Sequence, residues 1–522
     1  MIDWLIKDTI IIDGTGAPPF SGDIAIRGDR IVEVGNVGHI DPKKLIEAEG
    51  RITAPGFIDM HSHSDVLYLN GSPLTHKIYQ GVTTELIGQD GISAAPLTET
   101  SKQYVKEMIE PLAGHLEDEW KPWDVKRFLQ TLGEKKVPLN LMSLVGHCNL
   151  RLAVMGHRIA LPSQEELHRM GELLADGLNG GAVGLSLGLV YPPSSYSDTN
   201  ELISLGRVVK DYDSILIAHI RNEQDELLQA LEEMITVGRE TGCRIHISHL
   251  KCSGKNNWGN MPKVLEKLEP AFQQGIDIAF DQYPYEASCT SLSVLLPGWA
   301  MEGGWKGFHQ RSGSPEIRKG ILAALRKSIE GRGGPAGITI ASVQSQNNQG
   351  LTGKTLERIS GDRGISSEQA VLDLLIEEEL QVVAIYHAMS KEDVECAMTH
   401  FLQTVGSDGI LGKFPHPRAY GTFPRIISHF CRERKLFPLS EAIRKMTSAP
   451  AKRLNLDNRG RIERGVFADL LIFSPENFRD NASFENPKQF ASGLDWVFVN
   501  GKPLVKEGKL QEIYPGHVIM RI

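Results

Sequence analysis

Apolar runs recur through the middle of the chain, and a longer stretch with helical spacing follows each of them. Runs rich in valine, isoleucine and leucine on both alternating faces are typical of strands buried on both sides. Repeated strand–helix units favour a parallel sheet. Eight runs can be counted, at residues 54–63, 81–91, 139–147, 181–190, 214–221, 244–251, 277–285 and 404–409. The pattern therefore predicts an α/β fold with a (β/α)8 barrel of the TIM type.

Two further runs, at residues 337–343 and 381–387, also have the composition of strands but exceed the count of eight. We assign them to an insertion around residues 286–400. Within it, residues 297–316 are rich in glycine and aromatic side chains, which predicts a loop or lid over a functional site.

The two ends of the chain share a different pattern of short β-like runs separated by Gly, Asn and Asp turns. Such runs suggest small antiparallel sheets. We therefore expect residues 1–54 and 466–522 to form one β module, with the barrel domain at residues 55–465 between them. The runs lie at residues 9–16, 22–35, 44–56, 465–473, 494–505 and 509–522.

Polar residues close several of the barrel runs. Residues two apart in a strand point to the same face, so His61 and His63 can reach one cation. His219, His249, Asp408 and Asp90 close other runs. Functional residues of such barrels lie at the carboxyl ends of the strands, where all six side chains would converge. The alternative, that the six residues are unrelated, requires all of them to fall at strand ends by accident.

Imidazole and carboxylate groups are the ligands that zinc or another divalent first-row metal prefers. A metal held by neutral histidines lowers the pKa of its water and polarises a carbonyl group. Asp408 is the candidate to carry a proton from that water to a leaving nitrogen, although it could serve as a ligand alone. The pattern thus indicates a metal-dependent hydrolase that cuts a C–N amide bond.

Composition and charge narrow the partners and the cellular location that we expect for the protein. The chain has 522 residues, 41% of them hydrophobic, and a net charge of −9 without a Lys/Arg block. We therefore expect no nucleic-acid partner. The six cysteines form no CxxC pair, which suits a reducing compartment. Charged residues interrupt the apolar start, and no segment suits a membrane span, so we expect a soluble cytoplasmic protein.

Several segments together resemble the N-acyl-D-amino-acid deacylases of the amidohydrolase superfamily. They read PGFIDMHSHSD, HIRNE, ISHLK, DQYPYEA, VGSDG and HPRAYGTFPR, and a closing stretch from AIRKMTSAP to DLLIF adds to them. The resemblance implies a barrel with a small β-sandwich built from both termini. It implies a tighter metal site at His219 and His249, and a second, weaker one among His61, His63 and Asp408, with Asp408 as the general acid/base. One or two divalent ions, zinc foremost, would be the cofactors.

The resemblance also implies how a small N-acyl amino acid would be held. Lys251 and Tyr283 lie where the family binds the substrate carboxylate, and Arg418 is a further candidate because guanidinium grips carboxylate through two parallel bonds. Tyr191 and His147 follow two barrel runs and could hydrogen-bond the carbonyl oxygen. For these two, a role as polar wall residues is the alternative.

One position departs from the family, which typically has a cysteine ligand in an NCG segment after the second strand. This chain reads Gln89-Asp90-Gly91. A carboxylate can replace the thiolate, so we predict that Asp90 is a metal ligand and that the site tolerates harder metals than a thiolate site. If two metals bind, Asp90 is the best candidate to bridge them. Two alternatives remain for the function: a cyclic-amide hydrolase of hydantoinase or dihydroorotase type, and a non-catalytic scaffold with the same fold.

Overall fold

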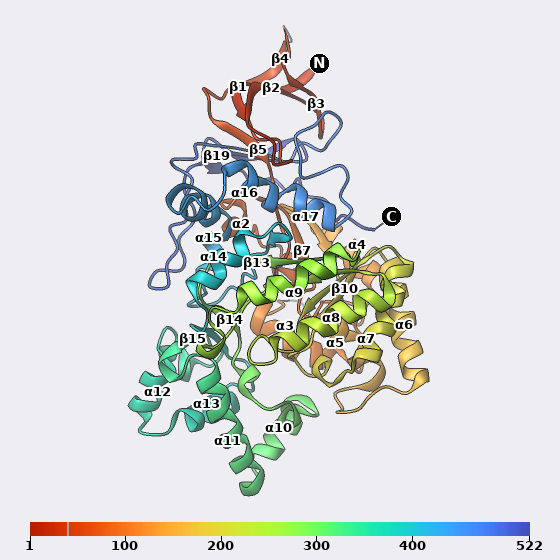
Figure 1. Ribbon diagram of the computed structural model, residues 1–522, viewed down its shortest axis with the longest axis vertical. Coiled ribbons are helices and arrows are strands. Elements are labelled where there is room, and N and C mark those ends of the chain that lie inside the picture. The colour runs from red at the N-terminus through yellow and green to blue at the C-terminus, as the bar shows by residue number, and fades with distance from the viewer. Residues whose placement is uncertain (39–40, 118, 522) are drawn as a thin grey trace.

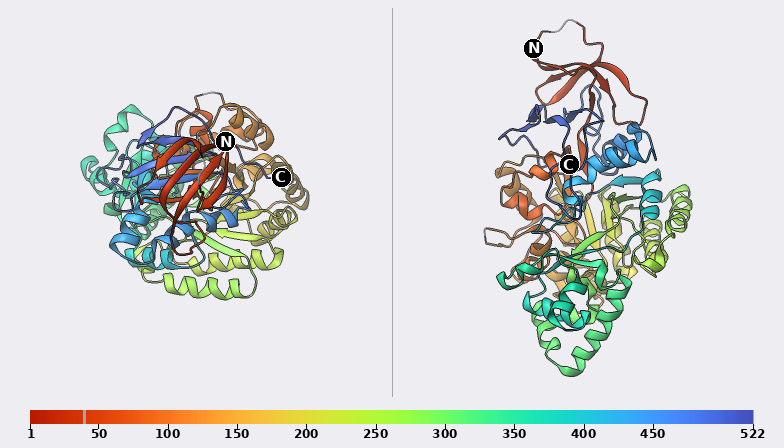
Figure 2. Two further views of the ribbon diagram at one scale, coloured as in Figure 1. Left: turned by 90° about the horizontal axis from the view of Figure 1, so that it is seen from above. Right: turned by 90° about the vertical axis from the view of Figure 1, so that its left-hand side faces the viewer.

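The computed structural model describes residues 1–38, 41–117 and 119–521. It has three parts along its long axis, with a β domain at one end, a barrel in the middle and a largely helical insertion at the other end (Figure 1). The view from the side shows the same order (Figure 2). The chain enters and leaves the barrel from the β domain.

Eight successive strand positions form the barrel, and the strands pair in parallel along the chain. The third position is split into two pieces, and the first and last positions are joined where Met60 N donates to Val405 O at 3.2 Å. The predicted (β/α)8 fold is confirmed. The strands are β6 (Phe57–Asp59), β7 (Val82–Ile87), β8 (Asn140–Ser143) with β9 (Val145–Gly146), β10 (Gly184–Gly188), β11 (Ile215–His219), β12 (Arg244–Ile247), β13 (Ile278–Gln282) and β17 (Gln403–Val405).

Amphipathic helices surround the barrel. Helix α7 shows why: Leu202, Leu205 and Val209 recur at helical spacing and are buried, and the Asp198 side chain accepts from the N–H of Glu201 at the helix start. None of the described helices is long and apolar enough to cross a bilayer. The main helices are α3 (Lys102–Ala113), α4 (Val125–Glu134), α5 (His147–Met155), α6 (Gln164–Asn179), α7 (Thr199–Asp211), α8 (Leu227–Thr241), α9 (Met261–Gln273), α14 (Lys391–Thr399), α15 (Arg418–Arg425) and α16 (Leu439–Met446).

The β domain is one continuous nine-stranded sheet to which both ends of the chain contribute. The sheet folds over its own core, so that the Trp4 ring packs 5.7 Å from Trp496 and 5.4 Å from Phe498. The strands are β1 (Ile2–Ile11), β2 (Phe20–Arg27), β3 (Arg30–Gly35), β4 (Pro42–Glu47), β5 (Ile52–Pro55), β18 (Leu470–Phe473), β19 (Leu494–Val499), β20 (Lys502–Lys506) and β21 (Lys509–Leu510).

The last predicted β run, at residues 509–522, is only partly a strand of this sheet. After β21 the chain leaves the sheet and runs along the barrel, where the N–H of Leu141 donates to His517 O at 2.9 Å. The alternating pattern of the tail therefore reflects pairing with barrel strand β8 and not with the terminal sheet. Residue 522 lies outside the described residues.

The segment between β13 and β17 carries a separate layer with its own apolar core. The two extra strand predictions are confirmed as β15 and β16, which form an antiparallel sheet with β14 in the order β14-β16-β15. The loop predicted at residues 297–316 is largely helical instead, because apolar side chains such as Phe308 pack into this core. The elements are β14 (Ser288–Ser291), α10 (Gly304–Ser312), α11 (Pro315–Gly331), β15 (Ile338–Ser342), α12 (Leu356–Arg363), α13 (Ser367–Glu377) and β16 (Val383–Tyr386).

A buried polar network joins the β domain to the barrel. Asp469, just before β18, pairs with the buried Arg459 and accepts from Asn140 Nδ2 of barrel strand β8 at 3.1 Å. Asn500 completes it, since its N–H donates to Asp469 Oδ1 at 2.7 Å and its amide donates to Asn140 Oδ1 at 2.8 Å. All four residues are buried, so each polar group depends on the others for its partner.

We predict that Asp469→Ala lowers the free energy of unfolding by about 3–5 kcal/mol, because it leaves the Arg459 guanidinium buried without a counter-ion. Denaturant-induced unfolding at neutral pH would measure the change. Asp495→Ala is the matched control, since its partly exposed carboxylate pairs with Arg51 at 3.3 Å and should contribute below about 1 kcal/mol. Equal effects of the two variants would contradict the prediction.

Candidate metal centre

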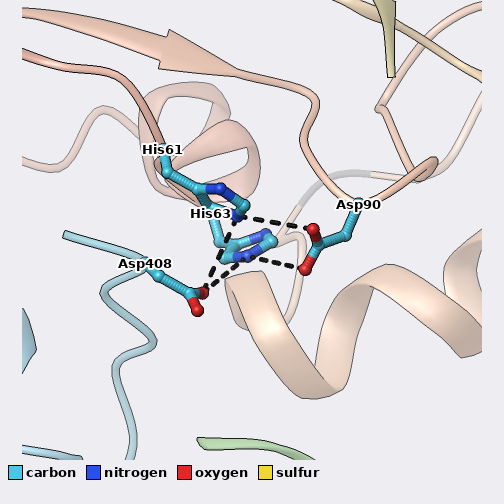
Figure 3. Close-up of side chains that lie close together, drawn as sticks. All are labelled: His61, His63, Asp90 and Asp408. Atoms are coloured by element: carbon cyan, nitrogen blue, oxygen red, sulfur yellow. Dashed lines mark ion pairs between the residues drawn. The ribbon is translucent and has the colours of Figure 1, made fainter. Parts of the chain in front are cut away.

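The six residues predicted to bind metal come together at the carboxyl end of the barrel. His61 and His63 follow β6, Asp90 follows β7, His219 ends β11 and His249 follows β12, while Asp408 follows β17. Figure 3 shows four of these side chains, His61, His63, Asp90 and Asp408, pointing toward one another. All six are buried.

Three of the six residues adopt left-handed backbone conformations, with φ of 56° at Asp90, 33° at His249 and 49° at Asp408. Such a conformation in a non-glycine residue costs on the order of 1–3 kcal/mol and persists only where the surrounding structure imposes it. The turn at Asp90 also needs a glycine opposite it, because a Cβ at Gly188 would lie 1.9 Å from Asp90 O. The backbone is therefore bent to aim these side chains inward.

The ligand atoms fall into two groups that share one carboxylate. His61, His63, Asp90 and Asp408 form the first group, and Asp90, His219 and His249 form the second, with all donor atoms of a group within 4.8 Å of one another. Asp90 Oδ1 lies 3.5 Å from His61 Nε2, 3.6 Å from His219 Nδ1 and 3.5 Å from His249 Nε2. Asp90 thus faces both groups at once.

The donor atoms fit a metal ion better than they fit one another. His61 Nε2, His63 Nε2, Asp90 Oδ1 and His219 Nδ1 are buried without a hydrogen-bond partner among the described residues. Buried polar atoms in proteins are almost always paired, so four orphaned donors and acceptors facing one point indicate a shared cation. Neutral imidazole and carboxylate donors suit zinc and similar divalent ions.

Charge at the centre also favours a cation. Burial raises the pKa of Asp90, but His61 and His249 outweigh burial and hold this pKa well below its ordinary value. Burial likewise raises the pKa of Asp408, but Arg418 and His61 outweigh burial and hold this pKa below its ordinary value, so this carboxylate also stays ionised. Conversely, Asp90 and Asp408 raise the pKa of His61 despite its burial. The carboxylates therefore attract positive charge to this point.

Glu223 is a site residue that sequence reasoning missed. Its Oε1 lies 3.2 Å from His249 Nδ1, its Oε2 lies 3.8 Å from His219 Nε2, and it pairs with Lys251. A carboxylate on the far ring nitrogen orients a metal-binding histidine and raises its basicity. The sequence does hold one indication of this role: Glu223 follows His219 and Arg221 at a regular spacing of two residues, on the chain that leaves β11.

Beneath the centre, a buried lysine holds two ligand-bearing turns. Lys77 Nζ lies 2.6 Å from Asp59 Oδ2 and 3.0 Å from Glu85 Oε1. Asp59 Oδ1 in turn accepts from the backbone N–H groups of His61 at 3.1 Å and Ser407 at 2.8 Å. The lysine thereby fixes the start of the His61 turn and of the Asp408 turn.

A second buried carboxylate, Asp281 of β13, steadies the histidines. Its Oδ1 accepts from the N–H of His249 at 2.9 Å, and its Oδ2 lies 3.1 Å from His246 Nε2 and 3.9 Å from His61 Nδ1. It lies in the DQYPYEA segment, but only the fold brings it beside His61.

Of the residues predicted to hold substrate, some line the pocket at the centre and others lie behind its wall. Tyr191 lines the pocket at the centre, with its hydroxyl 2.7 Å from Thr290 Oγ1. Lys251 lines the same pocket, with Nζ 2.8 Å from His249 Nδ1. Tyr283 and Arg418 are fully buried beside it, and the Arg418 guanidinium lies 4.5 Å over the Tyr283 ring.

The structure does not bring His147 to this pocket. Its ring is fully buried, with Nδ1 2.6 Å from Ser194 Oγ and Nε2 2.8 Å from Glu201 Oε1, so neither nitrogen remains for a substrate. Glu201 also pairs with the buried Arg151. The chain turns into α5 at this point, and His147 becomes part of a structural network behind the barrel wall.

The pocket itself is narrow. Its cavity is about 20 Å³, close to the space that one water molecule needs. Tyr191 and Leu112 separate it from a second cavity of about 70 Å³, whose walls are mostly apolar. The insertion reaches both cavities: Arg332 lines the first, and Met301 and Trp305 line the second.

A family model described as "Amidohydrolase family" matches residues 44–505. The chain belongs to the amidohydrolase family. This amidohydrolase is 33% identical to a D-aminoacylase of Alcaligenes xylosoxydans xylosoxydans, over 99% of this chain and 98% of the relative. It is also 33% identical to an N-acyl-D-glutamate deacylase of the same organism, over 100% and 97% of the two chains.

Solved structures give the same grouping. An N-acyl-D-glutamate deacylase of Bordetella bronchiseptica, complexed with zinc and a phosphonate mimic of the tetrahedral intermediate, matches with a TM-score of 0.86 and 32% identity. Coverage is 100% of both chains. An L-hydantoinase of Arthrobacter aurescens matches with a TM-score of 0.56 and 13% identity, which shows a shared fold alone.

We predict that Asp90→Ala lowers the metal content of the purified amidohydrolase by at least about one equivalent, because Asp90 belongs to both donor groups. Elemental analysis after dialysis would measure the stoichiometry. Asp124→Ala is the control, since this aspartate caps helix α4 on the surface. Unchanged metal content in Asp90→Ala would refute a ligand role for this carboxylate.

Proposed function

We propose that this amidohydrolase hydrolyses the amide bond of N-acyl-D-amino acids to a carboxylate and a free D-amino acid, with zinc or a similar divalent ion. The observation that carries the proposal is the pair of donor groups sharing Asp90, beside an ionised Asp408 and the cations Lys251 and Arg418. Relatives named as D-aminoacylase and as N-acyl-D-glutamate and N-acyl-D-aspartate deacylases support the substrate class and its handedness.

His219, His249 and Asp90 would hold one ion, and His61, His63, Asp90 and Asp408 a second. A bound divalent ion supplies Lewis acidity for the carbonyl group and lowers the pKa of water. The protein's own contribution is a fixed, buried set of ligands whose outer nitrogens are held by Glu223 and Asp281. These partners keep the imidazoles oriented and raise their basicity for binding.

Asp408 is proposed as the general acid/base. Arg418 Nη1 holds Asp408 Oδ2 at 2.9 Å, which leaves Oδ1 facing the centre, 3.2 Å from His63 Nε2. Asp408 Oδ1 takes the proton of the attacking water as oxygen bonds to the carbonyl carbon. It then delivers this proton to the amide nitrogen, so that the C–N bond breaks and the amine leaves.

Tyr191 and Lys251 are proposed to contact the substrate. The Tyr191 ring lies 5.2 Å from the His219 ring and borders the pocket, which supports a hydrogen bond from its hydroxyl to the carbonyl oxygen. Lys251, with Tyr283 and Arg418 behind it, supports binding of the substrate carboxylate. His147 is not proposed to take part.

Asp90 stands where the deacylase family typically has a cysteine. A carboxylate is a harder ligand than a thiolate and bridges two ions through its two oxygens, so we propose that this centre accepts harder metals than a thiolate centre does. The two groups that share Asp90 support the bridging role.

A cytoplasmic location is part of the proposal. All six cysteines are free, four of them buried, which suits a reducing compartment.

For the reaction itself, the cyclic-amide alternative has weaker support, since the hydantoinase structures share the fold at 13–15% identity.

We predict that the wild-type protein releases the free amino acid from N-acetyl-D-amino acids and that Asp408→Asn lowers kcat by at least about 100-fold, because the amide cannot accept the proton. A coupled assay for D-amino acids over a panel of D and L substrates, with metal content measured on the same preparation, would test this. Asp373→Asn is the control, since this aspartate pairs with Arg318 in the insertion.

Hydrolysis of hydantoins with no turnover of the N-acetyl-D series would discard the deacylase proposal. Full metal content without hydrolysis of any amide tested would favour a non-catalytic scaffold instead. Retained metal content and loss of turnover in Asp408→Asn would support the proton-transfer role.

A further inference from the structure

Three cationic side chains lie at or beside the pocket, and two of them are already paired. Lys251 pairs with Glu223, and Arg418 pairs with Asp408. The third, Arg332, lines the pocket from the insertion and is only partly buried. Among the described residues, no carboxylate forms an ion pair with it.

The five other arginines of the insertion all have partners for their side chains, and Arg311 donates to the backbone oxygens of Ala300 and Glu302. Ion pairs join Arg318 to Asp373, Arg326 to Glu368, Arg358 to Asp362 and Arg363 to Glu377. The guanidinium carbon of Arg332 lies 5.5 Å from the centroid of the Tyr386 ring. A ring face leaves the N–H donors of a guanidinium free in its own plane.

The backbone around Arg332 is fixed against the barrel. Arg332 ends helix α11, and its N–H donates to Ile329 O at 3.1 Å. The preceding residue, Gly331, accepts from Gln224 Nε2 at 2.7 Å, and Gln224 is the neighbour of Glu223. The following residue, Gly333, has φ of 99°, and a Cβ there would lie 2.8 Å from His387 O. The turn therefore docks on the loop that carries Glu223, and this places Arg332 over the pocket.

We propose that Arg332 binds a carboxylate of the substrate. A guanidinium without a counter-ion beside a narrow pocket is a strong receptor for a planar anion, which it can grip through two parallel hydrogen bonds. Lys251 and Arg418 already pair with Glu223 and Asp408, so Arg332 adds a positive charge at this pocket that no carboxylate among the described residues neutralises. The proposal rests on the proposed function, because N-acyl amino acids carry at least one carboxylate.

The carboxylate can be the α-carboxylate, common to every N-acyl amino acid, or the side-chain carboxylate of an acidic one. Four substrates separate the two sources: N-acetyl-D-leucine, its α-carboxamide, N-acetyl-D-glutamate and N-acetyl-D-glutamine. The values of kcat and KM for each would be measured with wild type, Arg332→Met and Arg332→Lys. Arg326→Met is the matched control, because Arg326 lies on the same helix and is paired with Glu368.

If Arg332 binds the α-carboxylate, Arg332→Met should raise KM roughly 10- to 100-fold for all three substrates with a free α-carboxylate and leave the α-carboxamide unaffected. If it binds a side-chain carboxylate, the same loss should appear for N-acetyl-D-glutamate alone. In either case Arg332→Lys should recover part of the loss, and Arg326→Met should match wild type.

An equal effect of Arg332→Met on charged and uncharged substrates, or no effect on any, would overturn the role of Arg332 while leaving the deacylase function intact. A wild-type protein that hydrolyses none of the four substrates would instead overturn the proposed function and this inference together. The α-carboxamide arm also reports whether the variant is folded, since its turnover does not depend on the lost charge.

Discussion

The mouth of the barrel must hold several buried carboxylates close together. Asp90, Asp408 and Glu223 are all buried or nearly so, and all three face the histidines of the centre. Neighbouring like charges repel one another strongly in such a low-dielectric setting. Two cationic side chains, Arg418 on α15 and Lys251 after β12, offset this repulsion, and the proposed metal ions would offset it further. The left-handed turns at Asp90 and Asp408 persist because these attractions hold the two side chains in place.

Much of the fold follows from local pattern, because barrel strands are apolar on both faces and their ends are marked by polar residues. The β6 run shows this well, since His61 and His63 mark both its end and the centre. The insertion departs from its local pattern. Residues 297–316 have the composition of a loop, yet α10 forms because Phe308 packs into an apolar core that only tertiary packing creates. Similarly, the tail after β21 has the pattern of a strand but pairs with the barrel.

The candidate ligand residues, which the fold brings together, could be predicted because their chemistry and their position at strand ends agree. Glu223, Asp281 and Lys77 could not be singled out in the same way, since each acts through partners that are distant in sequence and meet only in the folded barrel. His147 illustrates the opposite error. It stands at the right strand end, but the chain turns into α5 there and both ring nitrogens find partners behind the wall. Arg332 carried no signal, because nothing in the sequence says that the end of α11 returns to the pocket.

The position of β5 links the assembly of the terminal sheet to the metal centre. All four residues of β5 are buried, and β5 lies between β1 and β18 in the sheet, although β18 follows it by about 400 residues in the chain. At about 5–20 residues per second, ribosomal synthesis leaves this apolar strand edge without its partner for roughly 20–80 s. Unpaired edges of this kind promote aggregation. Because β5 runs directly into β6 and His61, the first candidate metal ligands of the nascent chain cannot rest on a finished sheet until translation has passed the barrel and reached β18 to β21.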